Sequence, residues 1–519
     1  MSESHHAPSP DTEAAAARIS GALHLGSDGH DAGASVRKLP TGITGFDHIA
    51  MGGLPARRAT VVAGQAGSAK TVFAAQFLAE GVRRGEPGVF VTLEEPAKDL
   101  RANLETLGWD VEAWEASNDW RFVDASPLAR GDETHPRSRY SVETLAAQIG
   151  HAVDATGAER LALDSLNGVL ALHEDSVSAR QQLRALISAL RGMGLTIVLT
   201  VETPGDPGGT LSRYGVEEFV ADNVVLLRNV REGSFRRRTI EVLKMRGAMH
   251  RKGDVGFTVV PGQGLEVLPV LAPHQDLQID STKVSTGSPG LDELTHGGVL
   301  RGASTLLTGP TGTGKTLLAT QFAADGANSG ERVLLMAYEE NRAQVFRNGA
   351  SFGYDFESLE EQGLLHVVPL YPEVASLDDH LVEIRALVTR LEPSRLVIDS
   401  LSALQRLGSE AAYREFVIGL TSFVRTVGIA TFMTASSPHL VGGTSVTESH
   451  ISGLLDAVVV LRHIEIGSRL KRGVLVLKMR GSSHEHEIRE LIIGGDSIEV
   501  GEAFSGLDGI LLGQATPQG

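Results

Sequence analysis

The residues best suited by type and spacing to chemistry lie between Gly309 and Thr316, where the sequence reads GPTGTGKT. The apolar run ASTLLT precedes this segment and LLATQFAADGA follows it, so we expect a buried strand, then a loop, then a helix. Glycines allow successive backbone N–H groups to point at a phosphate, and a helix N-terminus adds partial positive charge. We expect Lys315 to reach the β- and γ-phosphates of ATP, and Thr316 to offer its hydroxyl to Mg²⁺.

An earlier segment, GQAGSAKT at residues 64–71, is a second copy of this loop. Lys70 and Lys315 are 245 positions apart (315 − 70), and the same offset separates Thr41 from Thr286. The chain is therefore a tandem duplication of one nucleotide-binding lobe. The residues predicted to bind ATP in the two loops are Gly64, Gly67, Ser68, Ala69, Lys70, Thr71, Gly309, Thr311, Gly312, Thr313, Gly314, Lys315 and Thr316.

The first loop departs from the pattern because Ala69 stands where a glycine is expected before the lysine. In a left-handed backbone conformation an alanine costs about 1–2 kcal/mol. In the first turn of a helix, alanine is neutral or favourable. We expect the helical conformation at Ala69, and therefore an intact nucleotide site in the first lobe.

Each lobe also contains an apolar strand that closes on a carboxylate. LALDS ends in Asp164 and Ser165, and LVIDS ends in Asp399 and Ser400. In P-loop NTPases an aspartate at this position supports the Mg²⁺ shell together with the loop hydroxyl. We therefore predict Thr71, Thr316, Asp164 and Asp399 as the residues of two magnesium sites.

Two glutamate pairs, Glu94–Glu95 and Glu339–Glu340, come directly after the apolar strand that follows the first helix of each lobe. A carboxylate near the γ-phosphate can orient or deprotonate the attacking nucleophile, so these four residues are the predicted catalytic groups. Adjacent residues at a strand end point in opposite directions, so one of each pair faces the nucleophile. The alternative is that the glutamates cap the helix that follows.

The segment KMRG occurs at the end of a later strand in both lobes. Around it lie basic residues that could reach the phosphates of a neighbouring subunit, as arginine fingers do. The alternative from spacing alone is a solvated hairpin. The residues concerned are Lys244, Arg246, His250 and Lys252 in the first lobe and Lys478 and Arg480 in the second.

Short apolar strands alternate with amphipathic helices in both lobes, which predicts an α/β fold with two doubly wound, mostly parallel sheets. The expected organisation is an N-terminal arm at 1–35, a first domain at 36–262, a linker at 263–282, a second domain at 283–505 and a flexible tail at 506–519.

The composition narrows the class of protein. Lysine and arginine total 47 against 64 acidic residues, a net charge of −17, which argues against binding nucleic acid mainly by charge. There is no cysteine, so disulfides and thiolate sites are excluded. The sequence contains no apolar run long enough for a membrane span and no signal-peptide pattern. We expect a soluble, cytoplasmic protein.

From about residue 36 to 510 the chain resembles the KaiC family of bacterial clock ATPases and autokinases. The resemblance lies in long segments of both lobes: RYGVEEFVADNVVLLRN, RRRTIEVLKMRGAMHRKG, AYEENRAQVFRNGA, EFVIGLT, VTESHISG and KMRGSSHEHEIRE. It implies two RecA-like lobes per subunit, stacked as a double-ring homohexamer with ATP at the subunit interfaces. It further implies slow ATP hydrolysis in the first ring, phosphoryl transfer in the second, and contacts in trans from the KMRG clusters.

The resemblance also implies a phosphoacceptor. In the family the second lobe phosphorylates an adjacent serine and threonine in a segment similar to VTESHISG. Here Ser452 occupies the serine position, but Gly453 replaces the threonine, which leaves at most one site of the family type. Thr447 is a second, weaker candidate, and an unmodified Ser452 is the alternative.

The chain ends soon after the resemblance does, without the C-terminal segment through which some members engage KaiA. We therefore expect no dependence on KaiA, whereas the first ring could still accept a KaiB-like partner. Three functions remain open on these grounds. The leading one is a hexameric ATPase with serine autokinase and autophosphatase activity in timing or signalling; the others are a nucleotide-gated scaffold and a RecA-type DNA motor.

Overall fold

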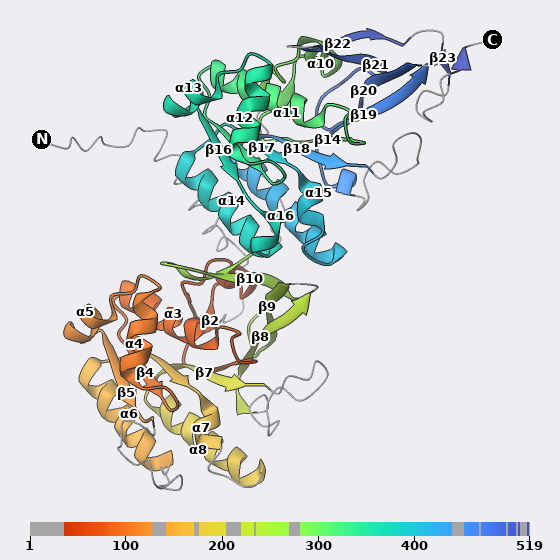
Figure 1. The fold of residues 1–519 in the computed structure, drawn as a ribbon. Helices are drawn as coiled ribbons and strands as arrows, with labels where there is room; N and C mark the ends of the chain where they lie inside the picture. The colour runs from red at the N-terminus through yellow and green to blue at the C-terminus, as the bar shows by residue number, and fades with distance from the viewer. Residues whose placement is uncertain are drawn as a thin grey trace, which may run out of the picture. The chain divides into compact units, whose positions relative to one another are not determined.

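The computed structural model describes residues 36–126, 142–170, 176–203, 220–232, 235–268, 281–437, 451–466, 469–494 and 497–504, and the backbone of two short strands beyond them. These residues form two compact units, one for each lobe. Figure 1 shows both units as helices flanking a sheet. The predicted arm at 1–35, most of the predicted linker, most of the predicted tail and Thr447 lie outside the described residues.

The first unit is built on a sheet in which, among the described residues, nine strands are ordered β11-β10-β9-β8-β3-β7-β6-β4-β5. Parallel pairs join the strands β3, β4, β5, β6, β7 and β8. The sheet continues through antiparallel pairs in β9, β10 and β11. The strands are β1 (Lys38–Leu39), β2 (Leu54–Pro55), β3 (Ala59–Gly64), β4 (Gly88–Thr92), β5 (Trp120–Asp124), β6 (Arg160–Asp164), β7 (Thr196–Glu202), β8 (Asn223–Glu232), β9 (Phe235–Met245), β10 (Val255–Val260) and β11 (Gly264–Val267). The helices are α2 (Phe46–Ile49), α3 (Lys70–Arg83), α4 (Ala97–Glu105), α5 (Val111–Ala116), α6 (Val142–Thr156), α7 (Leu166–Leu170) and α8 (Ser176–Gly192).

The second unit repeats this topology in the order β16-β15-β17-β18-β14-β19-β20-β21-β22. Its strands are β12 (Lys283–Val284), β13 (Val299–Leu300), β14 (Ser304–Gly309), β15 (Val333–Ala337), β16 (Leu365–Pro369), β17 (Arg395–Asp399), β18 (Ala430–Ser436), β19 (Ala457–Ile466), β20 (Arg469–Met479), β21 (Arg489–Ile493), β22 (Ile498–Ala503), β23 (Leu507–Asp508) and β24 (Thr516–Pro517). Its helices are α10 (Pro289–Leu294), α11 (Lys315–Asn328), α12 (Arg342–Ser351), α13 (Phe356–Glu361), η2 (Pro372–Val374), α14 (Leu377–Leu391), α15 (Leu401–Gln405), α16 (Glu410–Val427) and η3 (Ile451–Gly453). The predicted tandem RecA-like fold is confirmed.

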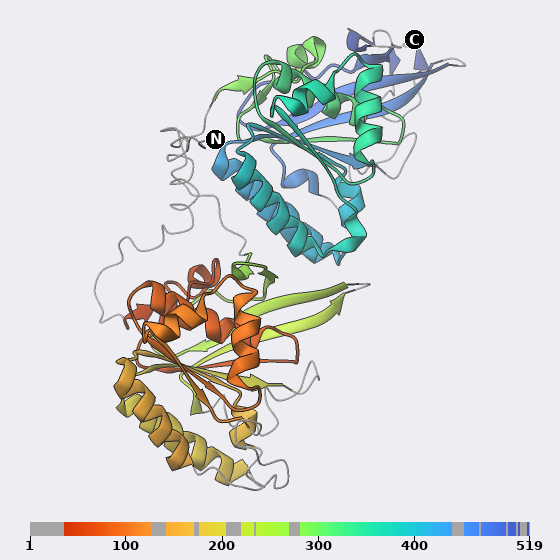
Figure 2. The ribbon, with the colours of Figure 1, turned by 60° about the vertical axis from the view of Figure 1, so that its left-hand side comes forward.

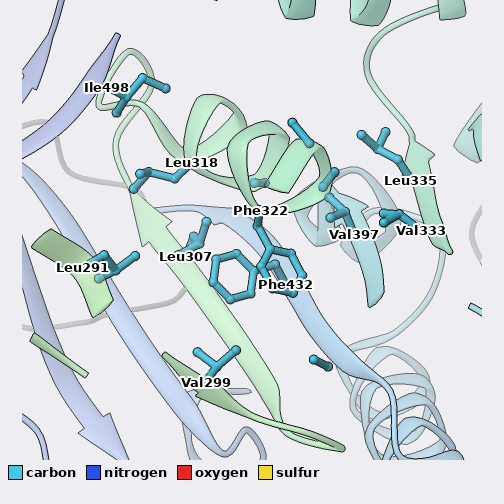
Figure 3. Close-up of a cluster of buried hydrophobic side chains, with 14 of the residues drawn as sticks. Leu291, Val299, Leu307, Leu318, Phe322, Val333, Leu335, Val397, Phe432 and Ile498 are labelled. Carbon is cyan, nitrogen blue, oxygen red and sulfur yellow. The ribbon is translucent and has the colours of Figure 1, made fainter. Parts of the chain in front are cut away.

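Both faces of each sheet are covered because alternate residues of a strand point to opposite sides. In β3, Val61 packs in the core on the side of α6 and α8, and Val62 packs on the side of α3. Figure 2 shows the long helices α6 and α8 together along one face of the first sheet, and α14 and α16 in the same relation to the second. In the second core Phe322 of α11 stacks on Phe432 of β18, with ring centroids 4.1 Å apart (Figure 3).

One buried arginine in each unit joins the P-loop helix to the sheet. Arg395, only 3% exposed, lies at the start of β17 and donates to the carbonyl oxygens of Ser285 and Phe322 at 3.0 Å each. It also pairs with Glu331. Arg160 makes the equivalent contacts in the first unit, with Glu86 as its acidic partner. These bonds fix the helix that carries the phosphate-binding lysine.

The predicted domain boundaries stay predictions, although the sheet of the first unit extends past residue 262. Strand β11, Gly264–Val267, pairs with β10 and packs in the first core. Among the described residues, no helix has both the length and the apolar character needed to cross a membrane.

Candidate active sites

Each phosphate-binding loop lies between a central buried strand and a helix, as the pattern predicts. In the second unit β14 leads into the loop and α11 begins at Lys315. In the first, β3 leads in and α3 begins at Lys70. Neither N-cap residue, Gly314 or Ala69, has a side chain that can accept the first N–H groups of its helix. These donors and the helix dipole are thus available to an anion.

Ala69 corrects one expectation from the sequence. Its backbone has φ 67° and ψ 28°, a left-handed conformation, and does not continue the helix. Gly314, the equivalent residue, has φ 103° and ψ 15°. The expectation of a helical alanine was therefore wrong: the loop needs the left-handed turn in both lobes, and the first lobe forms it with a side chain present. The strain at such a residue is about 1–2 kcal/mol.

The two loop lysines are bound to their own loops. Lys315 Nζ donates to the carbonyl oxygens of Gly309 at 2.8 Å and Pro310 at 2.9 Å, and Lys70 Nζ donates to Gln65 at 2.8 Å. Burial lowers the pKa of each lysine, and the charges of Asp399 and Glu339 partly raise the pKa of Lys315 again. A phosphate would supply the negative charge that a buried ammonium group requires.

The structure brings the predicted magnesium residues together. Thr71 Oγ1 donates to Asp164 Oδ2 at 2.7 Å. In the second unit a hydrogen bond from Thr316 lowers the pKa of Asp399, although burial, the larger effect, raises it. Hydroxyl and carboxylate oxygens are the ligands that Mg²⁺ prefers. Both pairs therefore fit a hard cation shared with the phosphates.

The glutamate pairs lie beside these residues, and they do not cap helices. Helix α12 is capped by Asn341, which forms a capping box with Gln344, and α4 begins after Pro96. Instead, the first glutamate of each pair accepts a hydrogen bond from the serine after the strand aspartate. Ser165 Oγ donates to Glu94 at 2.6 Å and Ser400 Oγ to Glu339 at 2.9 Å. The capping alternative is contradicted, and the glutamates remain candidates for catalysis.

The second glutamate of each pair has a different partner. Asn103 Nδ2 donates to Glu95 Oε1 at 2.8 Å. Asn348 Nδ2 lies 3.0 Å and 3.1 Å from the two carboxylate oxygens of Glu340. Burial raises the pKa of Glu95 and of Glu340, as do the neighbouring Asp164 and Asp399 respectively, while the asparagines lower it.

The basic residues around KMRG are not gathered at the loop of their own lobe. Lys478 and Arg480 lie at and just after the end of β20, and β20 is separated from the loop strand β14 by β19. They bind backbone carbonyls of the turn at 452–455. Lys244 likewise donates to the carbonyl of Ala221 at 2.9 Å. Arg246 lies just after the end of β9 in the first unit, and His250 and Lys252 lie in the segment between β9 and β10.

Ser452 lies in the short helix η3 and is partly exposed. Its carbonyl oxygen accepts from Lys478, so the predicted phosphoacceptor and the predicted trans cation belong to one local structure.

Sequence reasoning missed several residues at the sites. His463 Nε2 and Arg472 Nε contact the loop carbonyls of Thr311 and Gly312, at 3.2 Å and 3.0 Å. The asparagines and serines that bind the glutamates were also missed. Comparison of the two lobes could have found these, because Asn103 and Asn348 share the offset of the P-loops (348 − 103 = 245).

Comparisons with known proteins agree with this geometry. A family model for the KaiC ATPase matches residues 39–272 and 284–505. The circadian clock protein KaiC3 of Synechocystis sp. is 45% identical over 478 residues, which cover 92% of this chain and 94% of that protein. The circadian clock oscillator protein KaiC of Parasynechococcus marenigrum is 42% identical over 479 residues, covering 92% and 93%. That of Thermostichus vulcanus is 42% identical over 494 residues, covering 95% and 94%.

Proposed function

This chain belongs to the KaiC family of ATPases, and from that premise we propose that it hydrolyses ATP in its first lobe and transfers phosphate to Ser452 in its second. The observation that supports the proposal most directly is a hydrogen bond between the loop hydroxyl and the strand aspartate, which occurs in both lobes. It joins Thr71 to Asp164 and Thr316 to Asp399. It stands beside a serine-bound glutamate in both lobes. One lobe of this kind would suffice for binding, and the duplication gives two sites.

In the first lobe, Lys70 and the N–H groups at the start of α3 hold the phosphates of ATP. Thr71 and Asp164 would hold Mg²⁺, which neutralises charge on the β- and γ-phosphates when bound. Glu94 orients a water molecule and takes its proton as the water oxygen bonds to the γ-phosphorus. The bond to the bridging oxygen breaks at the same time, so the products are ADP and inorganic phosphate.

In the second lobe Lys315, Thr316 and Asp399 play the same parts, and Ser452 Oγ replaces water as the nucleophile. Its proton passes to Glu339, the new bond joins Oγ to the γ-phosphorus, and ADP leaves. ATP bound at the interfaces of a homohexamer would place Lys244, Arg246, Lys478 and Arg480 against a neighbour's phosphates. A serine hydroxyl must lie in line with the γ-phosphorus to react. Because Ser452 lies on the turn that Lys478 binds, assembly would also bring this serine toward a neighbour's nucleotide and so control the transfer.

The experiment is to incubate the full chain with Mg²⁺ and γ-labelled ATP and to locate the label by peptide mass spectrometry. We expect label on Ser452, lost in Lys315→Ala and retained in Lys70→Ala. Size-exclusion chromatography with and without ATP reports assembly. ATP consumption without labelled protein would eliminate the autokinase and leave the ATPase.

A nucleotide-gated scaffold is the second candidate, and Ala69 favours it, because the first P-loop departs from the usual pattern at this residue and keeps a left-handed backbone there with a side chain present. Turnover by the Lys315→Ala variant decides between them. Hydrolysis in that variant has to come from the first lobe, whereas a scaffold would bind ATP there without consuming it.

A further inference from the structure

The asparagines on the helices after the glutamate pairs have a role that the sequence did not suggest. Asn103 lies in the second turn of α4 and Asn348 in the second turn of α12, each eight residues after the glutamate that it binds (103 − 95 and 348 − 340). Side chains in a helix lean toward its N-terminus. Each amide therefore reaches back to the strand end where the glutamates lie.

The same arrangement occurs twice in lobes that differ in most other residues. In both, the serine that follows the neighbouring strand binds the first glutamate, and an asparagine on the following helix binds the second. The two carboxylates of a pair are thus held by different elements. The first is exposed in both lobes, and the second is partly buried in both.

The electrostatic surroundings distinguish the two glutamates further. Among the described residues, Glu94 is one of the charges that raise the pKa of Lys70, and Glu339 is one of those that raise the pKa of Lys315. The second glutamates interact with the strand aspartates, as the first glutamate of the second lobe, Glu339, also does with Asp399. The charges near Glu95 are Asp164 and Asp99, and those near Glu340 are Asp399, Arg347 and Glu339. In both lobes the charge of the first glutamate thus acts on the loop lysine.

We propose that Asn103 and Asn348 are positioning residues that hold Glu95 and Glu340 back, so that Glu94 and Glu339 alone face the γ-phosphate. This inference rests on the proposed function of the two sites. An asparagine amide donates to a carboxylate without adding charge, and it lets a second anion stay ionised close to the strand aspartate. Without it, two adjacent carboxylates compete for one position beside the phosphate.

The test uses hydrolysis by the first lobe, measured in the full chain with Lys315→Ala as background. We expect Asn103→Ala to lower kcat about tenfold while KM for ATP changes less than about twofold, because the phosphate contacts remain. Asn103→Asp, which has the same shape but repels Glu95, should lower kcat further. Asn103→Gln, which keeps the amide donor, should recover part of the loss.

Two additional measurements separate positioning from a structural role. The loss of kcat in Asn103→Ala should shrink toward low pH, because a carboxyl without its hydrogen bond protonates more readily and an uncharged Glu95 no longer competes for the position beside the phosphate. In the background Glu95→Ala, the Asn103→Ala change should alter kcat less than about twofold, since its partner is already gone. The control is Arg101→Ala on the same helix, which breaks the ion pair with Glu115 and does not touch Glu95.

Equal effects of Asn103→Ala with and without Glu95 would overturn the inference, as would a loss of kcat that does not shrink toward low pH or one matched by Arg101→Ala. Failure of the proposed function looks different. In that case the double variant Lys70→Ala/Lys315→Ala would hydrolyse ATP as fast as the unaltered chain.

Discussion

Lys478 Nζ lies 3.1 Å from the carbonyl oxygen of Ser452 and 2.7 Å from that of Leu455, so a cation expected to act on a neighbouring subunit also holds the turn of the proposed phosphoacceptor. Arg480 adds a bond to the carbonyl of Gly453 at 3.0 Å. Burial, and secondly the charge of Arg480, lowers the pKa of Lys478. Burial and Arg480 both disfavour the charged form of Lys478, so an anion brought near it would stabilise that form. A neighbour's nucleotide is one such anion.

We therefore predict that Lys478→Met loosens the turn at 452–455. A methionine fills similar space but donates no hydrogen bond, so amide hydrogen exchange in a peptide spanning 451–456 should accelerate about tenfold, the effect of losing roughly 1.4 kcal/mol of local stability. The matched control is Lys244→Met, which removes the equivalent bond to Ala221 in the first lobe. Unchanged exchange in the second lobe would show that Lys478 does not hold the turn.

The left-handed Ala69 gives a prediction with opposite signs in the two lobes. Ala69→Gly removes the strain but adds entropy to the unfolded chain, so the first lobe should gain at most about 1 kcal/mol. Gly314→Ala introduces the strain, and its new Cβ would lie 3.0 Å from Ile493 Cδ1 and 3.3 Å from Leu491 Cδ2. We expect that variant to lose about 1–2 kcal/mol. Chemical denaturation of each full-length variant measures both, and equal losses in the two would contradict the assigned strain.

The sequence was sufficient to predict the fold because the apolar strands and the repeated loop occur in a fixed order. Alternation along β3 places Val61 and Val62 on opposite faces, and the 245-residue offset revealed the second lobe. It was not sufficient for the backbone at Ala69. The residue type favours a helix, and the loop imposes the turn that its glycine counterpart accepts more readily.

The site was predictable for residues in a known motif and not for those that act through tertiary contact. Thr71 and Asp164 are 93 positions apart, yet each has a recognisable setting in sequence. Asn103 belongs to no known motif; its equivalence to Asn348 marks it as repeated, but its partner Glu95 is identified only by the fold, in which the second turn of α4 lies against the strand end. The trans contacts remain a prediction from resemblance, since they need a second subunit.

The buried arginines predict a stability effect far from the nucleotide. Arg395→Met should cost about 3 kcal/mol, because it leaves Glu331 and the carbonyls of Ser285 and Phe322 without their buried partner. Arg332→Met, which breaks only the half-exposed pair with Glu392, should cost less than about 1 kcal/mol. Urea denaturation, with hydrogen exchange to identify the lobe, makes the comparison. Similar losses in the two variants would mean that the buried network contributes no more than a surface pair.

The last prediction concerns pH and magnesium at Asp399. Burial raises the pKa of this carboxyl above the unfolded value, and hydrogen bonds from Thr434 and Thr316 only partly oppose this. The folded second lobe therefore binds the proton more tightly than the unfolded chain does. The contribution of protonated Asp399 to the free energy of unfolding is fully present below about pH 4, and it is lost as the pH rises through the folded pKa. In Asp399→Asn, which keeps the shape without the charge, that loss should disappear.

Thermal unfolding without nucleotide should accordingly show Asp399→Asn more stable than the unaltered chain near neutral pH, with the difference shrinking toward about pH 4. Mg²⁺ with ATP should reverse the order. Ligands that bind only the folded state raise its stability in proportion to their affinity, and the asparagine removes a charge from the proposed metal site. If Mg²⁺ and ATP stabilised the variant as strongly as the unaltered chain, Asp399 would not support the metal, and the assignment of Thr316 beside it would fail with it.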